Sequence, residues 1–279
     1  MNRRILVTAL LAGTAALSAC KKEPPASLPP EPQPTMTSTP GDNMSGGIAQ
    51  PGSQAHFEQG VNGQNVIYFE TDRYNVDSQD AAALQAQGLP VEAITLDVDD
   101  ADSIAAAARQ VAATHGHLDI LVNNAGILRD EMGRKPSEQS MAVWRATFET
   151  NLFAVVAVTQ AFLPLLHKSA AGRIVNVSSI LGSIALHADP ASPIYDFKVP
   201  AYNVSKTAVN AWTVQLAHEL RDTRIKVNAV HPGYVKTDMN AGEGELEIAD
   251  GARTSVRMAL LDAAGPNGSF VYFEDTLPW

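Results

Sequence analysis

Short apolar runs alternate with longer amphipathic stretches along the chain from about Gly88 onward. The short runs have the length of strands, and the longer stretches have apolar residues at helical spacing. A repeated strand–helix order predicts a parallel sheet covered by helices on both faces. The predicted strands are residues 91–96, 118–123, 173–178, 225–230 and 270–273. The predicted helices are residues 103–115, 140–168, 202–220 and 246–261.

The first twenty residues follow a different pattern. Arg3 and Arg4 precede an apolar run from Ile5 to Leu17, which is about five residues too short to span a bilayer. Small residues then lead to Cys20, and a chain with this single cysteine forms no internal disulfide. This order resembles a bacterial lipoprotein signal, in which Cys20 becomes the lipidated first residue of the mature chain. The alternatives are a secretory signal with an incidental cysteine, or an inert thiol.

The segment after the signal is not patterned like a folded domain. Residues 21–63 are rich in Pro, Gly, Ser and Thr, which predicts a disordered tether. Together with the signal and tether, Asn65–Gln87 resembles the beginning of a peptidoglycan-associated lipoprotein, an outer-membrane family, as far as about Ala82. The expected parts are a signal over 1–20, a linker over 21–63 and an α/β domain over 64–279, of which 64–81 derive from the lipoprotein.

Hydroxyl, phenol and amine side chains follow the strand predicted at 173–178. Ser178 and Ser179 stand where that strand ends, and Tyr202 and Lys206 stand four residues apart on one face of the next helix. A phenol has an ordinary pKa of about 10. An ammonium one turn away favours the phenolate and is therefore expected to lower that pKa. A nearby serine hydroxyl can donate to a carbonyl oxygen, so the group predicts proton transfer in alcohol–ketone chemistry.

Three further motifs surround this group in a fixed order. LDILVNNAG (Leu118–Gly126) and NLF, with Asn151, precede it, and VNAVHPGYVKTDM (Val227–Met239) follows. This set, in this order, resembles the short-chain dehydrogenase/reductase family over about residues 82 to 279. The resemblance implies a Rossmann-like, doubly wound parallel sheet and NAD(P)-dependent oxidoreductase activity.

The resemblance also implies catalytic roles. Tyr202 is the acid that protonates the carbonyl oxygen as hydride arrives, Lys206 lowers its pKa and binds the nicotinamide ribose, and Ser179 orients the carbonyl. Ser178 is then a packing or backbone partner. Asn151 is similar to a helix asparagine that holds a water linking the lysine to solvent; a solvated residue is the alternative for an isolated Asn.

The positions that touch the cofactor in the family fall in three loops. The resemblance places these contacts at Asp97 and Val98 beside the adenine, at Asn124, Ala125 and Gly126 in the turn after the 118–123 strand, and at Pro232, Gly233 and Thr237 facing the carboxamide. Tyr202 and Lys206 complete the set. For the Asn-Ala-Gly turn, support of the sheet alone is the alternative. Tyr195, which misses the four-residue spacing to Lys198, is assigned to the lining of the substrate loop.

One family feature is absent from the sequence. A complete member begins with a strand, a turn of the type T-G-x-x-x-G-x-G and a helix whose N-terminus holds the cofactor pyrophosphate. Because no such turn occurs here, we expect a Rossmann-like sheet that is N-terminally truncated and preceded by the signal and tether. VIYFE (Val66–Glu70) is a candidate strand for the gap between strands 91–96 and 118–123. A coincidental apolar run is the alternative.

The Ser179–Tyr202 spacing exceeds the dozen or so residues usual in the family. This spacing, GARTSVRMALL (Gly251–Leu261) and the terminal Pro278-Trp279 resemble the carbonyl reductase branch. That branch implies reduction of small ketones or aldehydes with NADPH, NAD being the other candidate. It also implies a monomer, because the insertion crosses the helix that forms tetramers.

Composition narrows the functions further. The 20 basic residues against 30 acidic ones give no indication of nucleic-acid binding. None of the 7 histidines stands at ligand spacing from cysteine or acidic residues, so no metal site is predicted.

Two functions therefore stay open. One is a carbonyl-reducing enzyme with its catalytic group intact. The other is an envelope lipoprotein with deficient cofactor binding, or a chimeric gene product without catalysis. The missing turn supports the second, as does export away from the cytoplasmic nicotinamide pool. The signal predicts lipid anchoring in the outer membrane, with the cytoplasm as the alternative.

Overall fold

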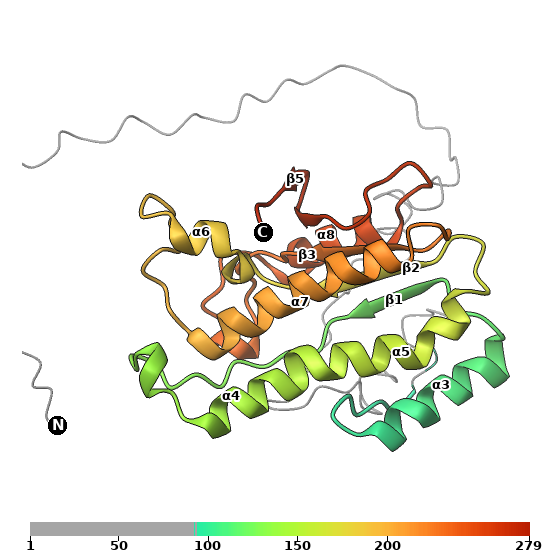
Figure 1. The fold of residues 1–279 in the computed structure, drawn as a ribbon, viewed down its shortest axis with the longest axis horizontal. Coiled ribbons are helices and arrows are strands. Elements are labelled where there is room, and N and C mark those ends of the chain that lie inside the picture. The colour runs from blue at the N-terminus through green and yellow to red at the C-terminus, as the bar shows by residue number, and fades with distance from the viewer. Residues whose placement is uncertain (1–91, 93) are drawn as a thin grey trace, which may run out of the picture. The chain divides into compact units, whose positions relative to one another are not determined.

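The computed structural model describes residues 92 and 94–279, which belong to one compact unit. The predicted signal, the predicted tether and the VIYFE segment lie outside the described residues. The proposed pairing of Val66–Glu70 with the sheet therefore stays a prediction. The described chain is built around one sheet (Figure 1).

The sheet has five strands in sequence order. They are β1 (Ile120–Asn123), β2 (Arg173–Val177), β3 (Lys226–Val230), β4 (Phe270–Tyr272) and β5 (Asp275–Thr276). The first four are parallel, and β5 pairs antiparallel with β4. The strands predicted at 118–123, 173–178, 225–230 and 270–273 are confirmed, and so is the parallel α/β class.

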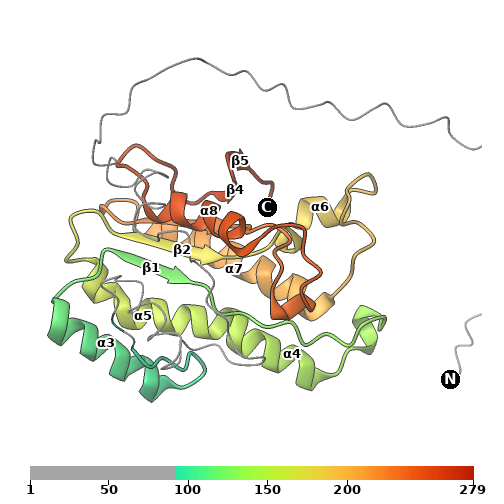
Figure 2. The ribbon, with the colours of Figure 1, turned by 180° about the vertical axis from the view of Figure 1, so that it is seen from behind.

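Helices cover both faces of this sheet (Figures 1 and 2). The α-helices are α3 (Ala101–His115), α4 (Met141–Phe148), α5 (Ala154–Leu166), α6 (Ile184–Ala188), α7 (Pro200–Glu219) and α8 (Ile248–Ala259). Short segments are the 3-10 turns η1 (Pro136–Glu138), η3 (Ile180–Gly182) and η4 (Asp238–Asn240), and the π-helical η2 (Glu149–Phe153).

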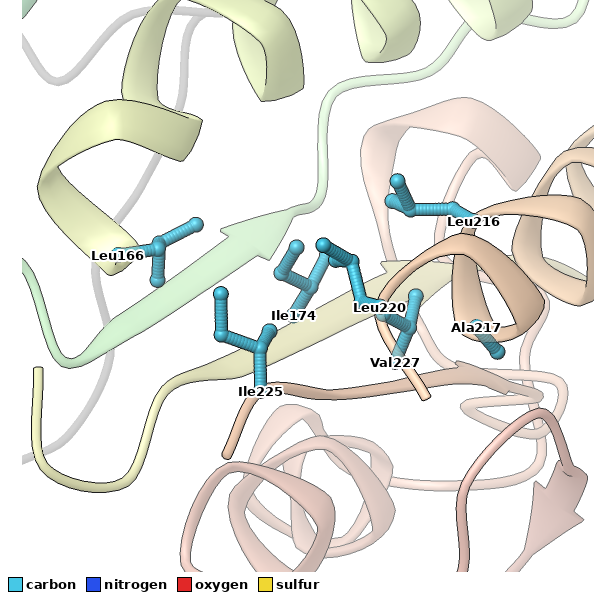
Figure 3. Packing of buried hydrophobic residues seen from close by; sticks show 7 residues of the cluster. All are labelled: Leu166, Ile174, Leu216, Ala217, Leu220, Ile225 and Val227. Atoms are coloured by element: carbon cyan, nitrogen blue, oxygen red, sulfur yellow. The ribbon is translucent and has the colours of Figure 1, made fainter. Parts of the chain in front are cut away.

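The apolar core is divided by the alternation of side chains along β2 and β3. Ile174 and Val227 face α5 and α7, where they join the cluster drawn in Figure 3. Val175 and Val230 face the other way and pack with Met258 of α8. All five side chains are at most 1% exposed. Each such burial contributes roughly 1.5–3 kcal/mol, so helices on both faces stabilise the sheet.

A polar ladder crosses the face covered by α5 and α7. The Asn123 amide donates to Thr159 Oγ1 at 3.0 Å and to Asn176 Oδ1 at 2.8 Å. The Asn176 amide donates in turn to Thr213 Oγ1 at 2.9 Å. All four side chains are buried. Because a buried amide is stable only when its hydrogen bonds are made, this ladder fixes α5, β1, β2 and α7 in one register.

The helix predicted over 140–168 is one continuous rod that contains an irregular turn. Ser140 caps α4 by accepting from Val143 N at 3.2 Å, and the rod then widens into η2 before α5 continues. Among the described residues, only Met141–Leu166 is long and apolar enough to cross a membrane by composition. The rod packs against α3 and α7, so we assign it to the core of the fold.

The strand predicted at 91–96 is not found in the described part of the chain. Residues 94–96 are irregular, and β1 ends the described sheet on that side. A strand exists only through hydrogen bonds to a neighbour, and an apolar pattern alone supplies none. The prediction for residues 94–96 was therefore wrong.

The connection between β2 and α7 contains a helix that the apolar pattern does not indicate. Ser183 caps α6 by accepting from Leu186 N at 3.2 Å, and Ala185 N donates to the carbonyl of Trp279 at 2.9 Å. The Trp279 ring stacks on Phe270, with ring centroids 5.7 Å apart. A five-residue helix is too short to show a period, which explains why it was missed.

Candidate active site

Helix α7 carries the phenol and the amine of the candidate site. Tyr202 and Lys206 lie one turn apart on the buried face of the helix, 8% and 4% exposed. The Lys206 nitrogen is 5.6 Å from the centroid of the Tyr202 ring. The four-residue spacing in the sequence thus places both groups on the side of α7 that faces the sheet.

The end of β2 supplies the hydroxyl. Ser179 makes a side-chain hydrogen bond with the Tyr202 phenol and also accepts from Leu181 N at 3.2 Å. Ser178 points elsewhere, with its hydroxyl donating to the Lys206 backbone carbonyl at 3.3 Å. Of the two serines, Ser179 is therefore the one placed against the phenol.

Lys206 reaches from α7 to the end of β2. Its ammonium donates to the Val177 carbonyl at 2.9 Å. Gly126 also lies close to the amine, because an added Cβ there would stand 3.2 Å from the Lys206 nitrogen. A residue with a side chain at position 126 would crowd the amine, so glycine there keeps room beside it.

Burial decides the protonation of both groups. It raises the pKa of Tyr202 to about 12, and the hydrogen bond with Ser179 acts in the opposite direction. Burial lowers the pKa of Lys206 to about 8. The expectation of a Tyr202 pKa below its ordinary value was wrong for this structure, because desolvation of the phenolate dominates. At neutral pH the phenol holds its proton and Lys206 is mostly an ammonium.

Asn151 lies in the middle of η2 and is fully buried. Its amide oxygen accepts from Ile127 N at 2.7 Å, and its amide nitrogen donates to the Ile127 carbonyl at 2.9 Å and to Ser205 Oγ at 2.9 Å. Ser205 Oγ donates to the Tyr202 carbonyl at 2.7 Å. Asn151 thus ties the turn after β1 to the turn of α7 that carries the phenol. Ser205, placed between Tyr202 and Lys206, was missed in the sequence because a single serine within a helix gives no signal.

The predicted cofactor residues lie at the carboxyl ends of the strands. Asn124, Ala125 and Gly126 follow β1, with Asn124 exposed and the other two half-buried. Pro232 and Gly233 follow β3, and the φ of Gly233 is +92°, in the left-handed region that favours glycine. Ligands of open α/β sheets bind at this edge.

The remaining predicted cofactor residues have structural partners. Thr237 is exposed and forms a capping box with Asn240 around η4. Asp97 accepts from Asp99 N at 3.0 Å in the turn before α3, where Val98 is half-buried. That turn reaches η2, because Asp99 accepts from Thr150 Oγ1 at 2.8 Å. No described hydrogen bond or ring contact joins these three residues to Ser179, Tyr202 or Lys206.

Helix α6 contains a histidine that has hydrogen-bond partners. His187 lies on α6, 3.0 Å from the Leu181 carbonyl and 2.9 Å from the Lys198 nitrogen. Burial lowers the pKa of His187, and the Lys198 charge lowers it further. Lys198 also stands 5.3 Å from the ring centroid of Tyr195, which is 37% exposed.

His231 is 8% exposed and follows β3. Its ring lies 4.8 Å from that of Tyr272, and Gly233 N donates to Nδ1 at 3.3 Å. Burial lowers the pKa of His231 to about 4, so the ring is neutral near pH 7. Within residues 92 and 94–279 no group of three His, Cys, Asp or Glu side chains could hold a metal ion.

The described residues fit one end of a dinucleotide cofactor. Lys206 uses one of the three donors of its ammonium on Val177, which leaves donors for the hydroxyls of a ribose beside Gly126. The phosphate end does not fit as well. In the family the pyrophosphate lies on the helix that follows the first, glycine-rich turn, and the sequence holds no such turn.

A parallel sheet with polar side chains converging at its carboxyl edge defines a Rossmann-like α/β protein. The model of the short chain dehydrogenase family matches residues 45–247, and the chain belongs to that family. The match begins before residue 82, where the motif-based resemblance was expected to start.

Individual relatives agree with this family. A short-chain dehydrogenase of Penicillium roqueforti is 41% identical over 171 residues, covering 60% of this chain and 66% of that protein. Carbonyl reductase [NADPH] 3 of Mus musculus is 33% identical over 233 residues, covering 70% of this chain and 82% of that protein. Among solved structures, NADPH-bound carbonyl reductase from chicken fatty liver is similar with a TM-score of 0.60 and 29% identity, covering 74% of this chain and 85% of that one.

Proposed function

We propose that this chain reduces a ketone or aldehyde with a nicotinamide cofactor, and that Tyr202 is the acid. The observation that carries the proposal is one buried phenol that is hydrogen-bonded to the Ser179 hydroxyl, with the Lys206 ammonium 5.6 Å from its ring centroid. Support also comes from relatives of the family that are named carbonyl reductases.

The chemistry follows from the protonation states. When bound, the nicotinamide would supply the hydride for the carbonyl carbon. Ser179 donates a hydrogen bond to the carbonyl oxygen, which gains negative charge as the reduction proceeds. Tyr202, with its pKa raised to about 12, holds a proton at neutral pH and transfers it to that oxygen. The Lys206 ammonium then stabilises the phenolate that Tyr202 becomes.

Substitution of the phenol tests this assignment. Tyr202→Phe removes the acid and keeps the ring, so reduction should slow by at least about 100-fold, the usual range for a lost acid. Wild type is the reference, and circular dichroism checks that the variant is folded. The rates are compared by the loss of NADPH absorbance. A Tyr202→Phe variant with unchanged turnover would remove the acid assignment.

The cofactor is proposed to be NADPH, since NADPH is named with two of the relatives. NAD is the second candidate, because the residues that choose between them lie toward the adenosine end. Titration of the purified protein with NADPH and NADH, followed by nicotinamide fluorescence, compares the two. Tighter binding of NADH would reverse the preference.

A second candidate function is favoured by one observation. The sequence holds no glycine-rich turn, and this weakens a phosphate site. On this alternative the chain is an envelope lipoprotein that binds no cofactor. Binding in the micromolar range in the same titration would support the reductase. No binding at millimolar cofactor would support the alternative.

The location and assembly are proposed from the sequence. We propose that Cys20 is lipidated and anchors the protein to the outer membrane, and that the α/β part is a monomer. Mass spectrometry of the mature N-terminus tests the anchor, because a diacylated Cys20 would begin the chain. An intact Met1 would point instead to the cytoplasm. Sedimentation of the detergent-solubilised protein tests the monomer.

A further inference from the structure

The first turn of α7 has two amides without partners in their own helix. Amides at the start of any helix lack acceptors there, and the N-cap side chain usually supplies one. In α7 the first residue is Pro200, which has no N–H, and the N-cap is Val199, whose side chain makes no capping hydrogen bond. Asn203 N already bonds the Val199 carbonyl at 2.8 Å. The amides of Ala201 and Tyr202 are therefore the ones that need an acceptor.

Asp130 meets this need from another part of the chain. Its Oδ1 accepts from Ala201 N at 2.8 Å and its Oδ2 accepts from Tyr202 N at 2.9 Å. The carboxylate is 7% exposed and lies at the positive end of the α7 dipole, which favours an anion. Figure 1 shows the connection from β1 to α4 passing the beginning of α7.

The carboxylate is itself held on both sides. Upstream, Asn151 brackets Ile127 with hydrogen bonds to its N–H and to its carbonyl. Downstream, Gln139 brackets Glu131 in the same manner, at 3.1 Å to its N–H and 2.8 Å to its carbonyl. The backbone on both sides of Asp130 is thus held in place, so its carboxylate can hold the first turn of α7 in place as well.

We propose that Asp130 is a positioning residue for Tyr202. The cap that Asp130 supplies sets where α7 begins, and this holds the phenol against the Ser179 hydroxyl. Tyr202 lies inside the capped turn, whereas Lys206 lies one turn later and is anchored separately by its bond to the Val177 carbonyl. Loss of the cap therefore loosens the phenol more than the amine. The catalytic consequence rests on the proposed function, while the capping itself does not.

Hydrogen exchange tests the capping without any substrate. In Asp130→Ala, exchange at the amides of Ala201 and Tyr202 should become at least about ten-fold faster, since local opening no longer breaks a bond. The last two turns of α7 should keep their protection. Ser140→Ala, which removes the cap of α4, is the matched control and should leave the start of α7 unchanged. Unchanged protection of Ala201 and Tyr202 in Asp130→Ala would overturn the proposal.

Kinetics test the positioning. Asp130→Ala should lower kcat at least about ten-fold while KM and the NADPH dissociation constant stay within about three-fold, because a misplaced reacting group affects the chemical step. Asp130→Asn keeps one acceptor oxygen, so its kcat should lie between that of Asp130→Ala and that of wild type. If Asp130→Ala does not fold, Asp130→Asn is measured in its place. Ser140→Ala should keep kcat.

Two further outcomes separate the capping of α7 from the positioning of Tyr202. Equal losses of kcat in Asp130→Ala and Ser140→Ala would mean that Asp130 only stabilises the helix, and would overturn the positioning role. If the wild type reduces no carbonyl compound, the proposed function fails. Hydrogen exchange at Ala201 and Tyr202 then decides alone whether Asp130 caps α7.

Discussion

Lys206 is a buried cation, and its ionisation should be visible in the pH dependence of the reaction. Burial lowers its pKa to about 8, and the form that stabilises a phenolate is the ammonium. The protonated fraction falls as pH rises through that value, so carbonyl reduction should be constant from pH 6 to 7 and decline above about pH 8. Stopped-flow measurement of kcat across this range checks it. A rate that rises through pH 8 would contradict an ammonium role.

The same burial should make Lys206 costly for stability. Its pKa is about 8 in the folded chain against an ordinary 10.5, a difference equivalent to roughly 3 kcal/mol. Below pH 8 both states carry the proton and the full cost of the buried charge is present; between pH 8 and 10.5 it declines. Lys206→Met should therefore melt at a higher temperature than wild type at pH 7, with a smaller difference at pH 10. Calorimetry at both pH values measures this.

At the residue scale, sequence reasoning found the members of the site but not their state. The spacing of Tyr202 and Lys206 predicts one helix face, and the end of β2 predicts where Ser179 stands. The direction of the Tyr202 pKa shift depends on how much solvent the fold removes. That quantity is set by residues far apart in the sequence, so no local pattern reports it.

Among the elements, the polar ladder offers the sharpest stability test. Asn176→Leu would leave one Asn123 N–H without its acceptor and Thr213 Oγ1 without its donor, both buried. Each lost partner costs about 1–3 kcal/mol, so the free energy of unfolding should fall by about 2–6 kcal/mol. Urea denaturation measures the change. In a double-mutant cycle, Asn123 and Asn176 should couple by more than about 0.5 kcal/mol, and additive effects would argue against a shared network.

Element boundaries were predictable where an apolar period was long. The helices at 103–115, 202–220 and 246–261 appear as α3, α7 and α8 with small shifts of their ends. The π-turn at η2 was not predicted, because one extra residue leaves the apolar period of the rod almost intact. The polar ladder was not predicted either, since its asparagines and threonines come from four separate elements.

For the molecule as a whole, the two ends of the cofactor site should bind with unequal strength. Residues around Tyr202 fit a nicotinamide ribose, whereas the sequence holds no glycine-rich turn for the phosphates. Reduced nicotinamide mononucleotide should therefore bind with a dissociation constant within about ten-fold of that of NADPH, a difference of at most about 1.4 kcal/mol. Isothermal titration with both ligands measures the ratio. A preference for NADPH above about 100-fold would show that the chain provides a phosphate site by other means.

The order of the sheet was predictable only in part. The alternation of strands and helices predicts β1 to β4 in parallel, because a strand–helix–strand connection brings consecutive strands side by side. The strand expected at 91–96 depends on a neighbour beyond β1, and whether such a neighbour forms is a property of the assembled sheet. For this reason the apolar pattern wrongly predicts a strand at residues 94–96.

The irregular turn of the long rod limits how the chain can change. α4 packs on α7 and α5 packs on α3, so the two ends of the rod serve different neighbours. Deleting Leu152 would restore an ordinary helix but rotate one end against the other by about 100°, the angle of a single residue. Either the packing of α4 on α7 or the packing of α5 on α3 would be lost. A chain of this design can exchange side chains along the rod, but it cannot shorten the rod by one residue.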